Sequence, residues 1–294
     1  MLSGLFKRRA DAPPPPAAEN PVPQAWPPGH FYSPLASPED VASGLRSPSE
    51  LLGLDLHDED QPAFLAEIAA LLPRLRFPET RTPGRRYFYD NGSFAALDAV
   101  CLATMLARFR TRRVIEVGSG HSSAALLDLR DDGIFAPEKL VFIDPDFSRL
   151  DPLLGPADRA GVTLLQQRVQ DVPLARFESL ESGDLLFIDS SHVSKVGSDV
   201  NHLVFEILPR LKPGVVVHVH DVFSNFEYPR VWFDEGRHWN EQYLLRAFLM
   251  HNRAFRVLLL SSRLYDRHTD FFRTHLPVAL KNGGGQLWLR VNEF

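Results

Sequence analysis

The sequence predicts an α/β fold, a doubly wound sheet with helices on both faces. Short apolar runs rich in Val, Ile, Leu and Phe recur along the chain, and segments of helical periodicity separate them, as in parallel sheets with crossover helices. Several of these runs end in glycine or in an acidic residue, which is typical of strands at the ligand-binding edge of such a sheet. With 294 residues, 44% of them hydrophobic, the chain can bury the core of one sizeable domain with extensions.

The most informative segment is Arg113–Ser123, with the sequence RVIEVGSGHSS. Its apolar first half predicts a buried parallel strand, and a turn with Gly118 and Gly120 leads into a helix that begins at His121. Glycines let the backbone pass close to a ligand, and the unpaired N–H groups of the first helical turn point toward it. The segment therefore predicts a nucleotide-cofactor loop. A dinucleotide fingerprint would have a third glycine where Ser123 stands, which argues against a dehydrogenase.

Further strands are expected downstream of this loop, at Leu140–Asp144, Val162–Arg168, Asp184–Ser190, Val215–Val219, Phe255–Ser262 and Gln286–Val291. Helices are expected where apolar residues recur at helical spacing, from Val196 to Leu211 and over Trp239–His251. A long loop is expected between the last two strands. An acid at the end of the second strand is placed to accept hydrogen bonds from ribose hydroxyls, which makes Asp144 the ribose candidate and Asp146 a weaker one.

The chain divides into three predicted parts. Residues 1–30 are expected to be a disordered Pro-rich tail, residues 31–110 an N-terminal helical extension, and residues 111–294 the main domain. Within the extension, helices are predicted at Ser37–Leu45, Gln61–Leu72 and Phe94–Arg108, and Cys101 occupies an apolar position of the last one, which predicts a core residue. Basic and apolar residues in Met1–Arg9 leave a membrane-surface or partner-docking role as an alternative for the tail.

The Glu-x-Gly-x-Gly pattern of Glu116, Gly118 and Gly120, followed by Asp144 at the right distance, resembles motif I of the class I S-adenosylmethionine (SAM)-dependent methyltransferases. The resemblance extends from Arg113 to the C-terminus. It implies SAM as the cofactor and a Rossmann-like sheet of seven strands in which the last strand runs antiparallel. The residues expected to bind SAM, with Gln170 and Asp171 facing the adenine, are Glu116, Gly118, Ser119, Gly120, Ser122, Asp144, Gln170, Asp171 and Asp189.

Acidic and imidazole side chains follow two later strands, Asp189 and His192 after one and His220-Asp221 after the other. This arrangement resembles the metal-dependent O-methyltransferases that act on macrolide sugars and related natural products. The resemblance implies that Asp189 and Asp221 bind Mg²⁺ and that His192 is the catalytic base. His220 takes a metal position where that group commonly has glutamate, and its imidazole favours Mn²⁺, Fe²⁺ or Zn²⁺. Alternatively, these side chains only hydrogen-bond within a polar pocket.

The sequence thus predicts a SAM-dependent methyltransferase that methylates a hydroxyl of a sugar or small natural product with the help of Mg²⁺ or another divalent cation. The aromatic segment Phe223–Trp239 is expected to overhang the substrate site. Two alternatives stay open: a metal-independent small-molecule methyltransferase that uses His192 alone, and a non-catalytic scaffold with the SAM-binding fold.

Composition excludes several other classes. The net charge of −5 argues against a nucleic-acid partner. A single cysteine excludes a disulfide framework and a thiolate metal cluster, and it favours a reducing compartment. No uninterrupted apolar run reaches the ~20 residues that span a bilayer. A cytoplasmic protein without a transmembrane segment is therefore expected, and homo-oligomerisation stays open.

Overall fold

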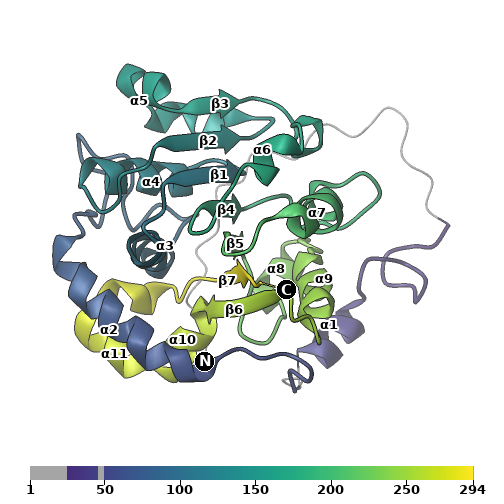
Figure 1. Cartoon of the computed structure of the whole chain (residues 1–294). Coiled ribbons are helices and arrows are strands. Elements are labelled where there is room, and N and C mark those ends of the chain that lie inside the picture. The colour runs from purple at the N-terminus through teal and green to yellow at the C-terminus, as the bar shows by residue number, and fades with distance from the viewer. Residues whose placement is uncertain (1–24, 46–49, 294) are drawn as a thin grey trace.

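The structure, a computed structural model, describes residues 25–45 and 50–293. Most of the predicted tail, including Met1–Arg9, lies outside the described residues. Figure 1 shows the central sheet, in which the order of the strands is β3-β2-β1-β4-β5-β7-β6. The strands are β1 (Arg113–Val117), β2 (Lys139–Ile143), β3 (Thr163–Leu165), β4 (Leu185–Ile188), β5 (Val216–His220), β6 (Phe255–Leu260) and β7 (Gln286–Val291).

Strand directions confirm the predicted fold class. Strands β1 to β5 pair in parallel, with Val117 beside Ile143 on one side and beside Ile188 on the other. Strand β7 is inserted between β5 and β6 and runs antiparallel to both. The carboxyl ends of β1, β2, β4 and β5 therefore meet at one edge of the sheet, where the acidic and glycine residues of the sequence motifs lie.

Helices cover both faces of the sheet (Figure 1). One face carries α2 (Gln61–Leu71), α3 (Ala96–Phe109), α4 (His121–Asp131), α10 (Ser261–Arg267) and α11 (Thr269–His275). The other face carries α6 (Ala175–Glu178), α7 (Asp199–His202), the π-helical turn η6 (Leu203–Ile207) and α9 (Glu241–Leu249). The remaining α-helices are α1 (Pro38–Gly44), α5 (Pro156–Gly161) and α8 (Arg230–Asp234).

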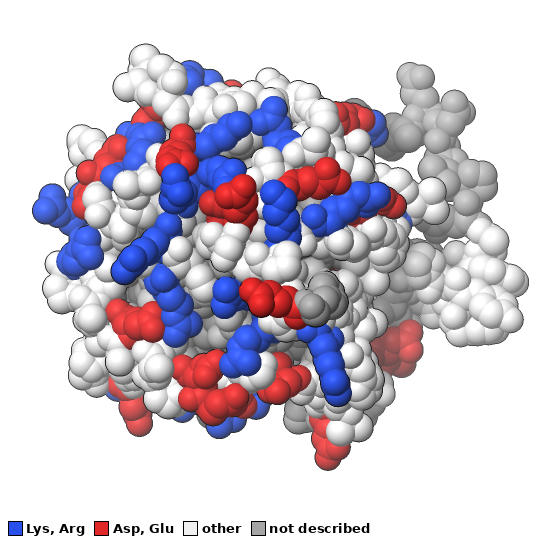
Figure 2. Space-filling view, in the orientation of Figure 1, with Lys and Arg blue, Asp and Glu red and all other residues white. Residues whose placement is uncertain are grey.

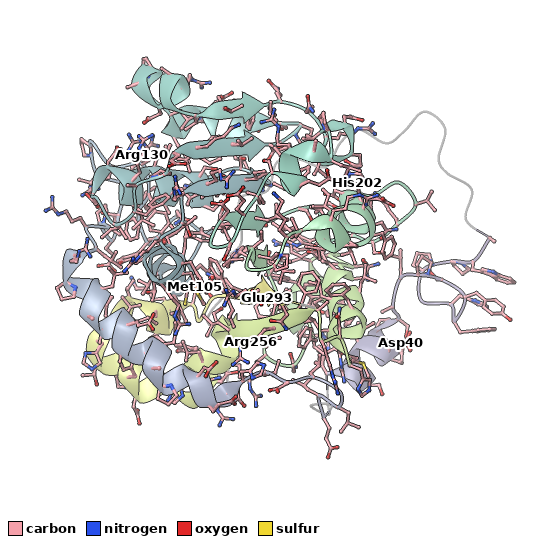
Figure 3. The ribbon with its side chains drawn as sticks, viewed as in Figure 1. Asp40, Met105, Arg130, His202, Arg256 and Glu293 are labelled. Carbon is pink, nitrogen blue, oxygen red and sulfur yellow. The ribbon has the colours of Figure 1, made fainter. Side chains whose placement is uncertain are left out.

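Along the strands, successive side chains point to opposite faces of the sheet and contribute to two separate hydrophobic clusters, one on each face. Val114 of β1 belongs to the cluster under α3, and its neighbour Ile115 belongs to the cluster under α9. Cys101 and Met105 of α3 are buried in the first cluster, and Figure 3 shows Met105 in the interior. The prediction that Cys101 is a core residue is confirmed. Burial of strands on both faces explains why their sequences are continuous apolar runs.

The extension before the sheet is fastened to the main domain by buried charge pairs. The predicted helix near Ser37 is α1, whose N-cap hydroxyl accepts a hydrogen bond from Asp40 N at 3.0 Å. Further along, the Arg86 guanidinium donates to Asp128 at 2.7 Å and to Asp158 at 2.6 Å, and both carboxylates are buried. The two bonds connect the segment before α3 with both α4 and α5. They are charge-assisted, because the guanidinium donates to an ionised carboxylate on each side.

Two predicted connections are wrong. Val196 is fully exposed in a turn, and the helix begins only at Asp199, after the N-cap Ser198. The link between β6 and β7 is not a long loop, because it contains α10 and α11. Leu264 and Phe272 of these helices are completely buried against the α3 face of the sheet. Each of these two helices has only seven residues, too few for a clear periodic signal, and is stabilised by its tertiary burial.

Charged side chains of both signs are interspersed over the face shown in Figure 2. Within the residues that the structure describes, no helix combines the length and the apolar character needed to cross a bilayer.

Candidate active site

The turn after β1 is shaped by the end of β4. Gly118 has φ +82°, its N–H donates to Ile143 O at 2.9 Å, and Asp189 N donates to Val117 O at 2.8 Å. A Cβ atom on Gly118 would overlap the carbonyl oxygen of Asp189 and lie 2.7 Å from the carbonyl carbon. The glycine is therefore required by the close approach of two strand ends, as well as by its positive φ.

Glu116 supports this turn from the interior of the protein. Its side chain is completely buried, and one carboxylate oxygen accepts a hydrogen bond from Ser123 Oγ, which in turn accepts one from Gly120 N at 3.1 Å. The other oxygen, Oε1, has no hydrogen-bond partner among the described residues. Burial raises the pKa of Glu116 to about 8, against the lowering effect of hydrogen bonds from Ser122 and Ser123.

A pocket of about 650 Å³ opens above the turn, a size suited to a nucleotide-sized ligand. Asp144 stands at its wall, where Oδ2 accepts from Ser119 N and Oδ1 accepts from Asp146 N, both at 2.8 Å. Of the residues predicted to bind SAM, the following line this pocket: Gly118, Ser119, Gly120, Ser122, Asp144 and Asp189. His121, Ser148 and Arg149, which the sequence analysis did not single out, line it as well.

Three predicted cofactor residues are not among the described residues that line this pocket. Glu116 lies behind the turn. The Gln170 side chain donates to Gly197 O at 2.9 Å, and the exposed Asp171 carboxylate pairs with Arg168 at 2.9 Å.

Asp189, His192 and Asp221 come together where β4 and β5 end. One potential ligand atom from each lies within 4.8 Å of the others. His192 Nε2 is 3.2 Å from Asp189 Oδ1 and 3.5 Å from Asp221 Oδ2. His192 and Asp221 both have positive φ, +60° and +57°, a strained conformation for residues with side chains that is common at functional sites. Two carboxylate oxygens and an imidazole nitrogen at these separations fit a divalent cation.

Among the residues that the structure describes, His220, which was predicted as a metal ligand, does not belong to this group. Its Nε2 lies 3.6 Å from Asp221 Oδ1, on the other oxygen of that carboxylate. The buried ring packs near Phe94, with centroids 5.4 Å apart, and lines a separate polar pocket of about 60 Å³. We call this smaller cavity the side pocket. Its lining residues are Gly92, Ser93, Asp98, His220, Asp221, Phe223, Trp232, Glu235, Arg237, Asn282, Gly284 and Gly285.

Glu241, which the sequence analysis missed, and Trp239, the last residue of the predicted aromatic segment, complete the surroundings of His192. Glu241, at the first position of α9, is buried and its Oε2 lies 2.9 Å from His192 Nδ1. The Trp239 ring packs on the imidazole, with centroids 4.4 Å apart. Burial alone would lower the pKa of His192, but hydrogen bonds to Asp189 and Glu241 outweigh it and raise that pKa well above its usual value.

Trp239 ends the aromatic segment Phe223–Trp239, which the sequence analysis expects to overhang the substrate site. No sequence signal separates Glu241 from a solvent-facing helix residue, because its contact with His192 joins positions far apart in the chain.

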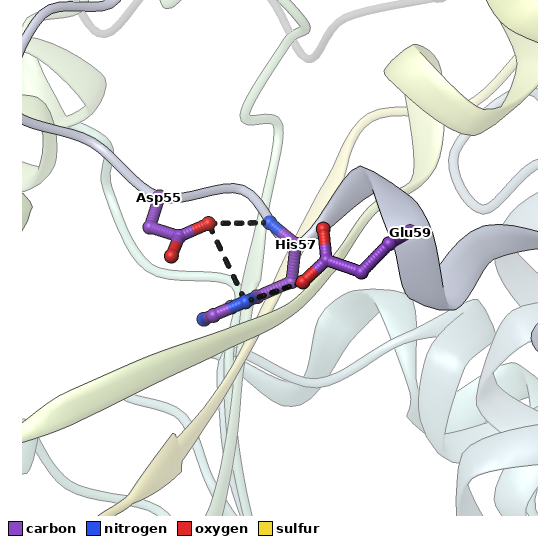
Figure 4. Close-up of side chains that lie close together, drawn as sticks. All are labelled: Asp55, His57 and Glu59. Atoms are coloured by element: carbon purple, nitrogen blue, oxygen red, sulfur yellow. Dashed lines mark hydrogen bonds and ion pairs between the residues drawn. The ribbon is translucent and has the colours of Figure 1, made fainter.

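A second group of potential metal ligands lies elsewhere, in the loop before α2. Figure 4 shows His57 Nδ1 between two carboxylates, 3.4 Å from Asp55 Oδ1 and 3.1 Å from Glu59 Oε1. Both carboxylates are largely exposed, at 75% and 69%. Hydration accounts for them without a bound ion.

Comparisons with known proteins place this site in a family. A family model described as a methyltransferase domain matches residues 115–222, a range that contains Gly118, Asp144, Asp189, His192 and Asp221. An uncharacterised protein of Archaeoglobus fulgidus is 32% identical over 171 residues, which cover 54% of this chain and 76% of the relative. The chain belongs to the class I SAM-dependent methyltransferases.

Solved structures that this chain is similar to are more distant in sequence. The O-methyltransferase TomG from Streptomyces achromogenes, involved in tomaymycin synthesis and solved with SAM, is 14% identical, with 86% of this chain and 94% of that chain covered and a TM-score of 0.44. The methyltransferase PaMTH1 of Podospora anserina, solved with S-adenosylhomocysteine, is 15% identical, with 79% and 89% covered and a TM-score of 0.44.

Proposed function

We propose that this methyltransferase transfers a methyl group from SAM to a hydroxyl oxygen of a small molecule, a sugar or a related natural product. The ion-assisted form of this proposal places a divalent cation between Asp189 and Asp221. One observation carries it: the group of Asp189, His192 and Asp221 lies directly beside the pocket above the glycine turn, and Asp189 belongs to both.

In this proposal, SAM binds in the pocket above the glycine turn, and different residues of that pocket bind different parts of it. Asp144 is placed to accept hydrogen bonds from ribose hydroxyls, because it stands at the end of β2 and its carboxylate orients the backbone of Ser119. The glycine turn and the first N–H groups of α4 face the same space. The adenine contacts expected of Gln170 and Asp171 stay predictions. SAM held by these residues would supply the methyl group, and its transfer needs an acceptor oxygen that can approach in line.

A cation at Asp189 and Asp221 would neutralise the negative charge of their carboxylates. Two carboxylates this close in a cleft repel each other unless a cation or a proton balances them. A divalent ion bound there would hold the acceptor oxygen and lower the pKa of its hydroxyl, so that the proton would pass to solvent water as the oxygen takes the methyl group and S-adenosylhomocysteine leaves. Asp189 and Asp221 supply the carboxylate ligands in this form.

The acceptor is expected to enter through the side pocket, which shares Asp221 with the proposed metal site. A volume of about 60 Å³ admits only a small polar group, such as the hydroxyl-bearing end of a larger molecule. Phe223 and Trp232 offer an aromatic wall, and Arg237 offers hydrogen-bond donors. Small-molecule acceptors, a cytoplasmic location and the absence of nucleic-acid substrates are parts of this proposal.

A second candidate function is favoured by the contacts of His192 itself. Its imidazole already lies between Asp189 and Asp221 on one side and Glu241 on the other, so a protonated ring balances these carboxylates without an ion. In this metal-independent form, His192 would accept the proton of the hydroxyl once the ring is neutral.

The deciding experiment measures release of S-adenosylhomocysteine from SAM with a panel of sugars and small natural-product alcohols. In the ion-assisted form, a chelator stops turnover, added Mg²⁺ or Mn²⁺ restores it, and Asp221→Asn, which lies outside the lining of the SAM pocket, abolishes it while SAM affinity is kept. Full turnover in the presence of chelator would establish the His192-only form instead. SAM binding without turnover on any acceptor would favour the non-catalytic scaffold.

A further inference from the structure

We propose that His192 is the third ligand of the divalent ion, through Nε2, and that Glu241 is the residue that positions it. His220 then stays outside the coordination sphere. This inference rests on the ion-assisted form of the proposed function, and it assigns a ligand set of two carboxylates and one imidazole.

Distances within the group favour His192 over His220. Nitrogen and oxygen ligands lie about 2.1 Å from ions such as Zn²⁺, so two ligand atoms are about 3.0 Å apart at a right angle and about 3.4 Å apart at a tetrahedral angle. His192 Nε2 meets both carboxylates at such separations, 3.2 Å and 3.5 Å. His220 Nε2 approaches only the far oxygen of Asp221, at 3.6 Å.

Glu241 decides which nitrogen of His192 faces the aspartates. An ionised carboxylate only accepts hydrogen bonds, so its contact at 2.9 Å requires a proton on His192 Nδ1. The lone pair of a neutral ring is then on Nε2, the nitrogen that points between Asp189 and Asp221. A carboxylate behind a metal-binding histidine is the usual way in which proteins orient the ring and strengthen its binding.

The backbone holds His192 in the same orientation. Its carbonyl oxygen accepts hydrogen bonds from the N–H groups of Asn240 and Glu241, at 3.0 Å and 3.1 Å. The Asn240 side chain accepts a further bond from Ser194 N at 2.6 Å. These contacts connect the start of α9 to the loop after β4 and maintain the positive φ of His192. The imidazole is therefore oriented by the protein and does not depend on an ion for its position.

This ligand set also predicts which ions bind. Mg²⁺ prefers a shell of oxygen atoms only, whereas an imidazole nitrogen beside two carboxylates suits Mn²⁺, Fe²⁺ or Zn²⁺. We expect Mn²⁺ to bind to the purified full chain about tenfold more tightly than Mg²⁺, because the site includes an imidazole nitrogen.

The test uses Mn²⁺ as the probe, because electron paramagnetic resonance reports both its affinity and its directly bound nitrogen atoms. Wild type is expected to show nitrogen coupling to Mn²⁺, His192→Gln to lose it, and His220→Asn to keep it. Glu241→Gln is expected to weaken Mn²⁺ binding about 10- to 100-fold, the usual effect of removing such a supporting carboxylate. Glu227→Gln is the matched control, because it removes a carboxylate that bonds Tyr243 rather than His192 and should leave the affinity unchanged.

Circular dichroism and S-adenosylhomocysteine binding verify that each variant is folded. Bound Mn²⁺ without nitrogen coupling, coupling lost only in His220→Asn, or equal affinities for wild type and Glu241→Gln would each overturn the assignment of His192 and Glu241 while leaving the ion-assisted function in place. Absence of Mn²⁺ binding in folded wild type would overturn both.

Discussion

Gly118 and Asp189 lie against each other at the point where β1 and β4 end. The backbone N–H of Asp189 continues the pairing of these strands by donating to Val117 O at 2.8 Å, and this brings its carbonyl oxygen directly over the glycine. The same Asp189 carries a carboxylate of the proposed metal site. The cofactor turn and the metal site are therefore built on a single backbone contact.

Replacing Gly118 by alanine should destabilise the protein more than its positive φ alone explains. Gly133→Ala is the control, because Gly133 has φ +69° and a Cβ atom there meets nothing within 4 Å. We expect Gly133→Ala to cost about 1–2 kcal/mol of the free energy of unfolding from backbone strain, and Gly118→Ala to cost about 1–3 kcal/mol more from steric overlap. Urea unfolding of both variants measures the difference, and equal costs would contradict the proposed overlap.

Asp144→Ala should weaken cofactor binding. It removes the carboxylate expected to bond the ribose and also releases the N–H group of Ser119. A lost bond to a charged group corresponds to about 1.5–3 kcal/mol, or roughly 10- to 100-fold in affinity for S-adenosylhomocysteine. Calorimetry measures the affinity and compares Asp146→Ala, the weaker ribose candidate, which does not line the pocket and accepts a hydrogen bond from Ser148 N. Unchanged affinity in folded Asp144→Ala would show that the ribose lies elsewhere.

Glu116 should make the folded state less stable as the pH rises. Burial raises the pKa of its carboxyl from 4.5 to about 8, so between these values the folded chain holds a proton that the unfolded chain has released. Protons bound in excess by the folded state mean that the free energy of unfolding falls with rising pH, by up to about 1.4 kcal/mol per unit.

In Glu116→Gln this slope should disappear, because the amide does not titrate. Urea unfolding at several pH values between about 5 and 8 compares the two proteins. The variant should gain stability relative to wild type across this window and no further above it. Parallel curves would mean that Glu116 is ionised in the folded protein.

Arg86→Ala should be strongly destabilising. It would leave the buried carboxylate of Asp128 without the guanidinium that pairs with it and leave Asp158 to the more distant Arg130, at 3.6 Å. Breaking a buried pair typically costs about 3–5 kcal/mol. Arg168→Ala is the control, because its pair with Asp171 is exposed and should contribute about 0–1 kcal/mol. Thermal and urea unfolding measure both, and similar small effects would show that the Arg86 contacts are hydrated.

Much of the fold and part of the site could be predicted from local pattern. The apolar run before Gly118 and the helix after it were predicted within a few residues, because a strand buried on both faces and a glycine turn leave a continuous signal in the sequence. The acids at the ends of β2, β4 and β5 followed from the same rule. Helices α10 and α11 were not predicted, because each is short and gains its stability from packing on the α3 face of the sheet.

The sequence by itself determined the succession of strands along the chain, the cofactor turn and the presence of Asp189, His192 and Asp221 at strand ends, since all of these depend on residues close together in the chain. Only the tertiary structure decided which side chains meet. Glu241 reaches His192 because the start of α9 is bonded to the loop after β4, and His220 lines the side pocket. Contacts between distant segments depend on the packing of the whole sheet, which no local pattern records.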